Sequence, residues 1–172
     1  PWFRLPLGKP KIVDVRLEVT PEGGTVEFFS GTVVTAGVPH LVIECEDAHG
    51  IAPTRLAAIA PCLRYHRDLG AEGANVDFVT VRGRREVDIR CWERGVEGET
   101  LSSGTGCIAA AIALSRGGRC DAKIILRSRA GLTSEVRLEA GQTGDIEAVL
   151  SGEARVIFTG VLGEEATLGF VV

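Results

Sequence analysis

Two serines and two glycines stand between a charged segment and an apolar one in the stretch WERGVEGETLSSGTGCIAAAIA, which ends at Ala113. The Ala- and Ile-rich part predicts a buried helix from about Ser103 to Ser115. The first turn of a helix has N–H groups without intrahelical partners and carries roughly half a positive charge. Gly104 and Gly106 would let a ligand approach the backbone. The stretch therefore suits a carboxylate or a phosphate.

The serines allow other interpretations. A helix capped by a serine, with no ligand, is the simpler one. A Walker A loop is excluded because no lysine follows the glycines. A GxSxG nucleophile elbow is excluded because neither Ser102 nor Ser103 has a glycine on each side at that spacing. Arg94 could clamp a carboxylate, or it could pair with Glu97 at the surface.

The bulk composition limits the class of protein. The chain has 172 residues, 45% of them hydrophobic and 24% charged, which favours one globular domain. Its net charge of −4 without a basic block gives no reason to expect nucleic acid as a partner. No apolar run is long enough to span a membrane. Five scattered cysteines without a CxxC pair indicate reduced thiols and a cytoplasmic location. The three histidines lack metal-site spacing with these cysteines, so we expect no metal.

The elements that must hold the Ser-Gly stretch are mostly strands. Residues 1–10 are rich in Pro and aromatics and predict an arm or linker. The segment TVEFFSGTVVTAG predicts two strands with a break at the glycine. A second helix is expected from Pro53 to Leu69, kinked or split by Pro61. Many strands and two helices predict an α+β domain, with a mainly antiparallel sheet wrapped around a central helix.

Three segments carry a resemblance to a known family. The run from Glu93 to Gly106 resembles the pattern E-R-G-x-G-E-T-x-A-C-G-[ST]-G in the second half of diaminopimelate epimerases. AGVPHLVIE is similar to the family's G-N-P-H segment, and GANVDFVTV is similar to its N-V-x-F segment. The whole chain can be laid on the family's C-terminal half, which implies a diaminopimelate-epimerase-like fold.

The resemblance implies an amino-acid epimerase or racemase that needs no cofactor, pyridoxal phosphate included, in lysine and peptidoglycan precursor biosynthesis. Family members have two pseudo-symmetric domains, each with a cysteine at the N-terminus of its central helix. One thiolate removes the α-proton of the amino-acid substrate, and the other thiol reprotonates the opposite face. The matching positions in this chain are His40, Glu93 and Ser103 at the reacting centre, and Asn75, Arg94, Gly104 and Thr105 at the substrate.

Three positions depart from the family's pattern. Ser103 stands where the catalytic cysteine is expected, and a serine hydroxyl is a far weaker acid than a thiol. Cys107 lies one turn further along and is expected to pack in the core. Val38 replaces the Asn of G-N-P-H, which argues against diaminopimelate itself as substrate. Glu97 is an additional residue in the loop that presents Glu93.

The sequence also indicates that a partner domain is missing. It contains no methionine and begins at Pro1, so we expect a C-terminal fragment. Residues 11–160 would form the domain, and residues 161–172 would belong with an N-terminal partner domain that completes the cleft. The resemblance also allows a homodimer.

Three other functions remain open beside the epimerase. One is a one-base dehydration of a hydroxylated amino acid, and another is an inactive anion-binding domain. A serine hydrolase that uses Ser103 and His40 is the least favoured, because no acidic residue has the spacing of an orienting partner.

Overall fold

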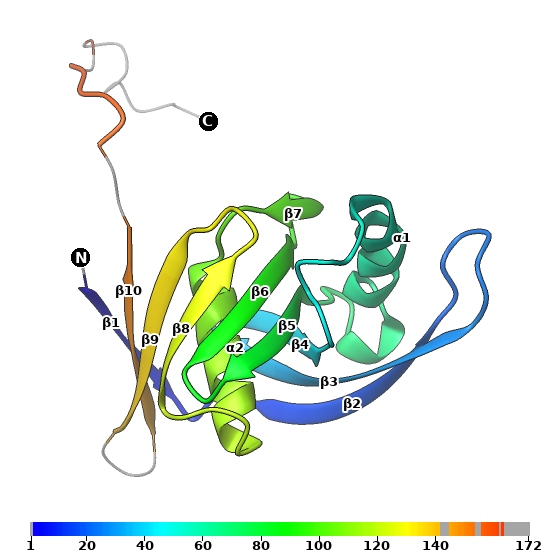
Figure 1. The fold of residues 1–172 in the computed structure, drawn as a ribbon, viewed down its shortest axis with the longest axis horizontal. Helices are drawn as coiled ribbons and strands as arrows, with labels where there is room; N and C mark the ends of the chain where they lie inside the picture. Colours follow the sequence, from blue (N-terminus) through cyan, green and yellow to red (C-terminus); the bar gives the residue numbers. More distant parts are fainter. Residues whose placement is uncertain (1, 142–144, 154–155, 162, 164–172) are drawn as a thin grey trace, which may run out of the picture.

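The computed structural model describes residues 2–141, 145–153, 156–161 and 163 (Figure 1). The described chain forms ten strands, two α-helices and one short 3-10 turn. In chain order these are β1 (Trp2–Gly8), β2 (Ile12–Val19), β3 (Glu27–Ala36), β4 (Val38–Glu44), α1 (Pro53–Arg64), the turn η1 (Arg67–Leu69), β5 (Asn75–Gly83), β6 (Glu86–Glu93), β7 (Gly98–Thr100), α2 (Gly104–Arg116), β8 (Lys123–Ser128), β9 (Thr133–Ala140) and β10 (Ile146–Gly152).

All the strands belong to one sheet. Their order is β1-β10-β9-β8-β6-β5-β4-β3-β2, and the short β7 pairs with β6. Neighbouring strands are antiparallel except for β4–β5 and β6–β8, which are parallel. Figure 1 shows the sheet curving around α2, while α1 packs near β2 and β5. The predicted α+β fold, with a mainly antiparallel sheet around a central helix, is confirmed.

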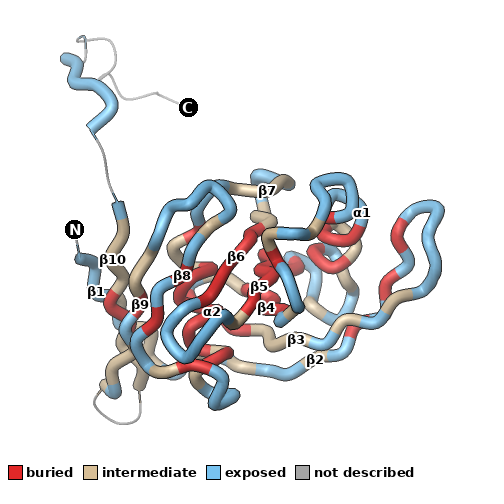
Figure 2. The backbone as a smooth tube through the Cα atoms, viewed as in Figure 1, coloured by how far each residue is buried: buried red, intermediate tan, exposed pale blue. Residues whose placement is uncertain are grey.

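Helix α2 lies inside the curved sheet because its side chains are small or apolar. Its buried residues run from Gly106 to Ile112 and include Leu114, and they contribute to the red core in Figure 2. Ser103 is the N-cap and Gly117 the C-cap, so the predicted helix is confirmed to within about a residue at each end. The sequence thus places the start of this helix correctly.

The apolar core occupies both faces of the sheet. Alternate residues of a strand point to opposite faces. In β5, Val79 packs in the cluster that contains α2, whereas Val76 and Phe78 pack in the cluster that contains α1. The same alternation turns Asn75 and Asp77 towards α2. Two polar residues of one strand are thereby aimed at the central helix.

The N-terminal segment differs from the arm or linker expected for residues 1–10. Residues Trp2–Gly8 form strand β1, which pairs antiparallel with β10. Leu5 and Leu7 pack against the core cluster that contains α2. Pro6 is tolerated because β1 is an edge strand, where a missing N–H need not break a ladder. Pairing with a strand more than 130 residues away could not be inferred from local composition.

Two expected breaks in the chain also differ. Gly31 lies inside the continuous strand β3, and a Cβ there would come within 2.6 Å of the Val42 carbonyl oxygen. The glycine therefore permits close approach of β4 and does not interrupt the strand. Pro61 lies inside α1, which continues to Arg64, and the 3-10 turn at 67–69 follows separately. The predicted helix therefore divides after Arg64 and not at the proline.

The C-terminal part is only partly described. Residues 156–161 have no regular secondary structure. The predicted terminal segment 161–172 lies outside the described residues apart from positions 161 and 163. Neither of the helices in the described ranges is long and apolar enough to cross a bilayer.

Candidate functional site

Four segments converge at the N-terminal end of α2. They are the start of β4, the start of β5, the end of β6 and the first turn of α2. His40 of β4 is the register partner of Asn75 in the parallel strand β5, and Asp77 lies two residues further along β5. All three side chains are on the face of the sheet that packs against α2. The fold therefore gathers polar residues that lie far apart in the sequence.

Ser103 caps the central helix. It has an extended backbone conformation, and its Oγ accepts a hydrogen bond from the Gly106 N–H at 3.2 Å. Only 6% of the residue is exposed. Its oxygen thus stabilises the first turn of α2 in the way that serine commonly does at this position. None of the hydrogen bonds found in the described residues joins Ser103 to His40.

His40 is completely buried and both of its ring nitrogens have partners. Its Nδ1 lies 2.7 Å from Asp77 Oδ2, and its Nε2 lies 3.0 Å from Thr105 Oγ1. The Asp77 side chain is equally inaccessible. No spacing in the sequence marked an acidic partner for His40, yet Asp77 is one, and the hydroxyl that His40 contacts belongs to Thr105 and not to Ser103.

Asp77 is the residue that sequence reasoning missed. A charged residue among the apolar residues Val76, Phe78 and Val79 of strand β5 was the available signal, because a buried carboxylate needs a partner. Its partner is 37 residues away, and the parallel register of β4 and β5 that joins them is not visible in either segment alone.

Asn75 links the histidine to the loop after β6. Its Oδ1 accepts a hydrogen bond from the Arg94 backbone N–H at 2.7 Å. Its Nδ2 lies 3.4 Å from the Pro39 carbonyl oxygen and 3.3 Å from His40 Nε2. Asn75 is 6% exposed, and these three contacts use both of its amide hydrogens and one of the two lone pairs of its oxygen.

The hydrogen bonds among His40, Asn75, Asp77 and Thr105 form one network. Glu93 and Arg94 lie at its rim. The Thr100 hydroxyl donates to Glu93 Oε1 at 2.9 Å. The Arg94 side chain is 28% exposed, and its guanidinium lies 3.7 Å from the exposed carboxylate of Glu72. The expected alternative partner of Arg94, Glu97, is not its partner. Arg94 remains accessible to a ligand.

Glu97, the additional residue of the loop, has a structural role. It adopts a positive φ of 53°, and its Oε1 accepts from the Gly95 N–H at 3.0 Å and from Arg64 Nη2 at 3.2 Å. The Gly95 N–H is the main cause of the lowered pKa of the Glu97 carboxyl, and Arg64 adds to it. The additional residue is thus held by the buried Arg64, which fixes the loop that carries Arg94.

The two glycines of the first turn of α2 serve different purposes. A Cβ at Gly106 would lie 2.7 Å from Asp77 Oδ1 and 3.0 Å from Ser103 Oγ. The close approach at Gly106 is therefore to protein atoms and not to a ligand. At Gly104 the nearest contact would be a flexible Leu150 methyl at 3.1 Å. The N–H groups of Gly104 and Thr105, at the open end of the helix, are the ones left for an anion.

The neighbouring thiols do not replace the missing cysteine. Burial raises the pKa of Cys107 to about 12, with the Asp77 charge adding to the effect. Burial also raises the pKa of Cys91 well above its ordinary value. Cys107 packs in the core, as predicted. In the part of the chain that the structure describes, no group of three or more His, Cys, Asp or Glu residues is arranged to hold a metal ion.

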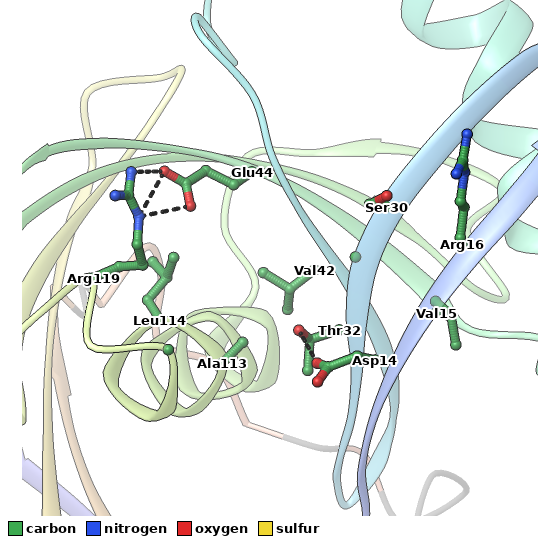
Figure 3. A pocket seen from close by; sticks show the side chains of 12 residues that line it. Asp14, Val15, Arg16, Ser30, Thr32, Val42, Glu44, Ala113, Leu114 and Arg119 are labelled. Carbon is green, nitrogen blue, oxygen red and sulfur yellow. Dashed lines mark hydrogen bonds and ion pairs between the residues drawn. The ribbon is translucent and has the colours of Figure 1, made fainter.

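A separate cavity lies at the other end of α2. It has a volume of about 550 Å³, and Figure 3 shows Leu114 and Arg119 on one side and residues of β2 and β3 on the other. Two of its carboxylates already have partners, since Glu44 pairs with Arg119 and Asp14 accepts from the Thr32 hydroxyl at 2.8 Å. None of the polar residues of the network lines this cavity. Cavity volume alone therefore does not mark the candidate site.

Comparison with known proteins agrees with the sequence pattern. The family model for diaminopimelate epimerase matches residues 32–157. The diaminopimelate epimerase of Gemmatimonas aurantiaca is 38% identical over 156 residues, which cover 87% of this chain and 55% of the relative. That of Moorella thermoacetica is 31% identical over 166 residues, covering 91% of this chain and 56% of the relative. The chain spans about half the length of the curated relatives it matches.

Solved structures share the fold. A probable proline racemase from Agrobacterium radiobacter K84 has a TM-score of 0.62 at 14% identity, over 92% of this chain and 54% of that chain. A hydroxyproline epimerase from Agrobacterium vitis, solved with bound trans-4-hydroxy-L-proline, has a TM-score of 0.59 at 18% identity, over 88% of this chain and 50% of that chain. At these identities the likeness shows the fold alone.

Proposed function

This chain belongs to the diaminopimelate epimerase family, and we propose that it forms one half of the cleft of a cofactor-independent amino-acid epimerase. The observation that carries the proposal is the open N-terminus of α2, which is surrounded by His40, Asn75 and Arg94 from three different strands or their ends. Unpaired helix N–H groups suit the α-carboxylate of an amino acid, and the accessible side chain of Arg94, in the loop whose backbone contacts Asn75, is available to clamp it.

In this proposal the protein residues stabilise charge at the reacting centre. Removal of an α-proton leaves a carbanion, and donors preorganised around the carboxylate stabilise it as it forms. The N–H groups of Gly104 and Thr105 and the guanidinium of Arg94 supply those donors. Glu93 flanks the reacting carbon, whereas the buried His40 would act through Thr105, whose hydroxyl it contacts at 3.0 Å. The opposite face of the substrate would be covered by an N-terminal domain or an equivalent chain, either in one polypeptide or in a homodimer.

Ser103 occupies the position of one of the two bases. In a two-base reaction a thiolate would stand there, because the N-terminus of a helix lowers the pKa of a thiol. A serine hydroxyl does not ionise at neutral pH, and Ser103 Oγ already accepts from Gly106. The capping role favours a second candidate, a dehydration of a hydroxylated amino acid, in which the partner half's base alone removes the α-proton and hydroxide leaves from the β-carbon.

Exchange of the α-hydrogen tests the proposal. We would mix this chain with the N-terminal half of the Gemmatimonas relative and incubate it in D₂O with diaminopimelate, proline and threonine, whose hydroxyl is on the β-carbon. NMR would follow the loss of the Cα–H signal. We expect Ser103→Cys to accelerate exchange strongly over the unmodified chain, whereas the matched control Ser103→Ala does not.

Three outcomes discriminate among the candidates. Exchange that appears only with Ser103→Cys supports the two-base site. Conversion of a hydroxylated amino acid to a keto acid and ammonia by the unmodified pair supports the dehydration, since the enamine product hydrolyses in water. Binding of amino acids without exchange in any variant would contradict both reactions and leave an anion-binding domain.

A further inference from the structure

We propose that Asp77 is a positioning residue that holds His40 as its neutral Nδ1–H tautomer, so that the Thr105 hydroxyl donates to His40 and turns its oxygen lone pairs to the ammonium group of an amino-acid ligand. The ligand part of this inference rests on the proposed function. The tautomer part rests on the hydrogen-bond network alone. Together they make the first turn of α2 a site for both charged groups of an α-amino acid.

The backbone of Arg94 fixes the orientation of the Asn75 side chain. A backbone N–H can only donate, so the Asn75 atom 2.7 Å from the Arg94 nitrogen must be the amide oxygen. The amide nitrogen then points the other way. Its two hydrogens are directed to the Pro39 carbonyl oxygen at 3.4 Å and to His40 Nε2 at 3.3 Å. The backbone thus fixes which end of Asn75 faces the histidine.

The tautomer of His40 follows from these contacts. Because Nε2 faces an amide N–H, it must carry a lone pair and no hydrogen. A neutral imidazole then has its hydrogen on Nδ1, which lies 2.7 Å from Asp77 Oδ2. A carboxylate can only accept, so both ends of the ring require the same tautomer.

Thr105 is the point at which this network reaches the open end of the helix. Its Oγ1 lies 3.0 Å from Nε2, which has no hydrogen to give, so the hydroxyl must be the donor. Thr105 is half-buried, whereas His40 and Asp77 are inaccessible. The hydroxyl therefore has only lone pairs left, and it can accept from a cationic N–H but cannot donate to an anion.

The same turn of helix thus offers two kinds of group. The N–H groups of Gly104 and Thr105 are donors suited to a carboxylate, and Thr105 Oγ1 is an acceptor suited to an ammonium group. A simple carboxylic acid would satisfy only the donors. We therefore assign the site to an α-amino acid in preference to a carboxylate without an amino group.

The tautomer can be measured without any ligand. Long-range ¹H–¹⁵N correlation spectra of the labelled chain distinguish Nδ1–H from Nε2–H imidazole, and His49→Gln with His66→Gln leaves only the His40 signals. We expect the Nδ1–H pattern. Asp77→Asn should shift it towards Nε2–H, since the new amide can donate to Nδ1, whereas the exposed control Asp14→Asn should not. An Nε2–H or doubly protonated ring in the unmodified chain would overturn the inference.

A matched pair of ligands tests the second part. The chain, completed by the N-terminal half of the Gemmatimonas relative, would be titrated with diaminopimelate and with pimelate, which has the same carboxylates and no amino groups. We expect diaminopimelate to bind about tenfold tighter or more, the usual effect of a hydrogen bond to a charged group. Thr105→Val should remove most of that preference without weakening pimelate binding, and Thr105→Ser should retain it.

The possible failures are distinguishable. Equal binding of the two ligands by the unmodified protein would overturn the ammonium assignment and leave the proposed carboxylate site intact. Absence of binding by diaminopimelate and by the other amino acids of the exchange experiment would overturn the proposed function together with the ligand part of the inference. In both cases the NMR result still confirms or refutes the role of Asp77 in orienting His40.

Discussion

The two ends of helix α2 carry polar groups in opposite ways. At its N-terminus, His40 and Asp77 are fully inaccessible and contact each other at 2.7 Å. At its C-terminus, Asp14 pairs with Arg116 and Glu44 with Arg119, and all four side chains are at least 36% exposed. The larger space lies at the exposed end, in the 550 Å³ cavity of Figure 3.

The contrast indicates where function should be sought. Exposed ion pairs remain hydrated and contribute little to the stability of the fold, so their presence implies no special role. Burying polar groups is unfavourable unless each has a directional partner, and such networks add little to stability over apolar packing. A buried network that ends in a half-exposed hydroxyl at a helix N-terminus is therefore the stronger candidate, although the cavity beside it is smaller.

The largest expected difference between the two ends is in stability. His40→Ala leaves a cavity and removes the hydrogen-bond donor of the buried Asp77 carboxylate, and we expect a loss of about 3 kcal/mol or more in the free energy of unfolding. Glu44→Gln, at the exposed end, should leave the unfolding midpoint unchanged within error. Urea denaturation followed by circular dichroism would measure both. Similar midpoints for the two variants would contradict the comparison.

The space around a glycine differs between the two ends of α2, and this difference gives the second largest expected effect. The methyl group of Gly106→Ala would press on Asp77 and Ser103, and we expect it to destabilise the fold by about 1–3 kcal/mol. Gly117→Ala is the matched control, because its nearest contact would be an ordinary 3.4 Å and its φ is −73°. Thermal unfolding would compare them. A neutral Gly106→Ala would mean that the network has room to move.

Capping provides a smaller effect. Ser103→Ala removes the acceptor of the Gly106 N–H and should destabilise the chain by about 1 kcal/mol. Ser103→Asp should retain the cap, and Ser115→Ala in the last turn should have almost no effect. Denaturant titration of the three variants would check this order. An equally stable Ser103→Ala would refute the capping role.

The smallest effect concerns the exposed end in acid. Arg116, and then Thr32, lower the pKa of Asp14 from 3.8 to about 2. The stabilisation from this pair is therefore present above the ordinary pKa and is lost as the pH falls towards 2. Because the group is exposed, we expect no resolvable change in overall stability. NMR titration of the Asp14 carboxyl should show the low midpoint, and Arg116→Gln should raise it. An unchanged midpoint would exclude Arg116 as the cause.

Features that depend on neighbouring residues were predictable from the sequence. The start of α2 at Ser103 follows from a serine before glycines and an apolar run, and the family follows from the segment Glu93 to Gly106. The resemblance to the family implied that His40 and Asn75 lie near this helix. The sequence did not show which side chains His40 and Asn75 would contact.

The pairing of side chains was decided by the tertiary structure. Asp77 meets His40 because β4 and β5 are parallel in one particular register, and Thr105 meets the same ring across 65 residues. A shift of one residue would turn these side chains to the opposite face of the sheet. The sequence by itself determined the helix, its cap and the family, because capping and apolar periodicity are local. The network around His40 depends on strand register and on the curvature of the whole sheet, which no short segment encodes.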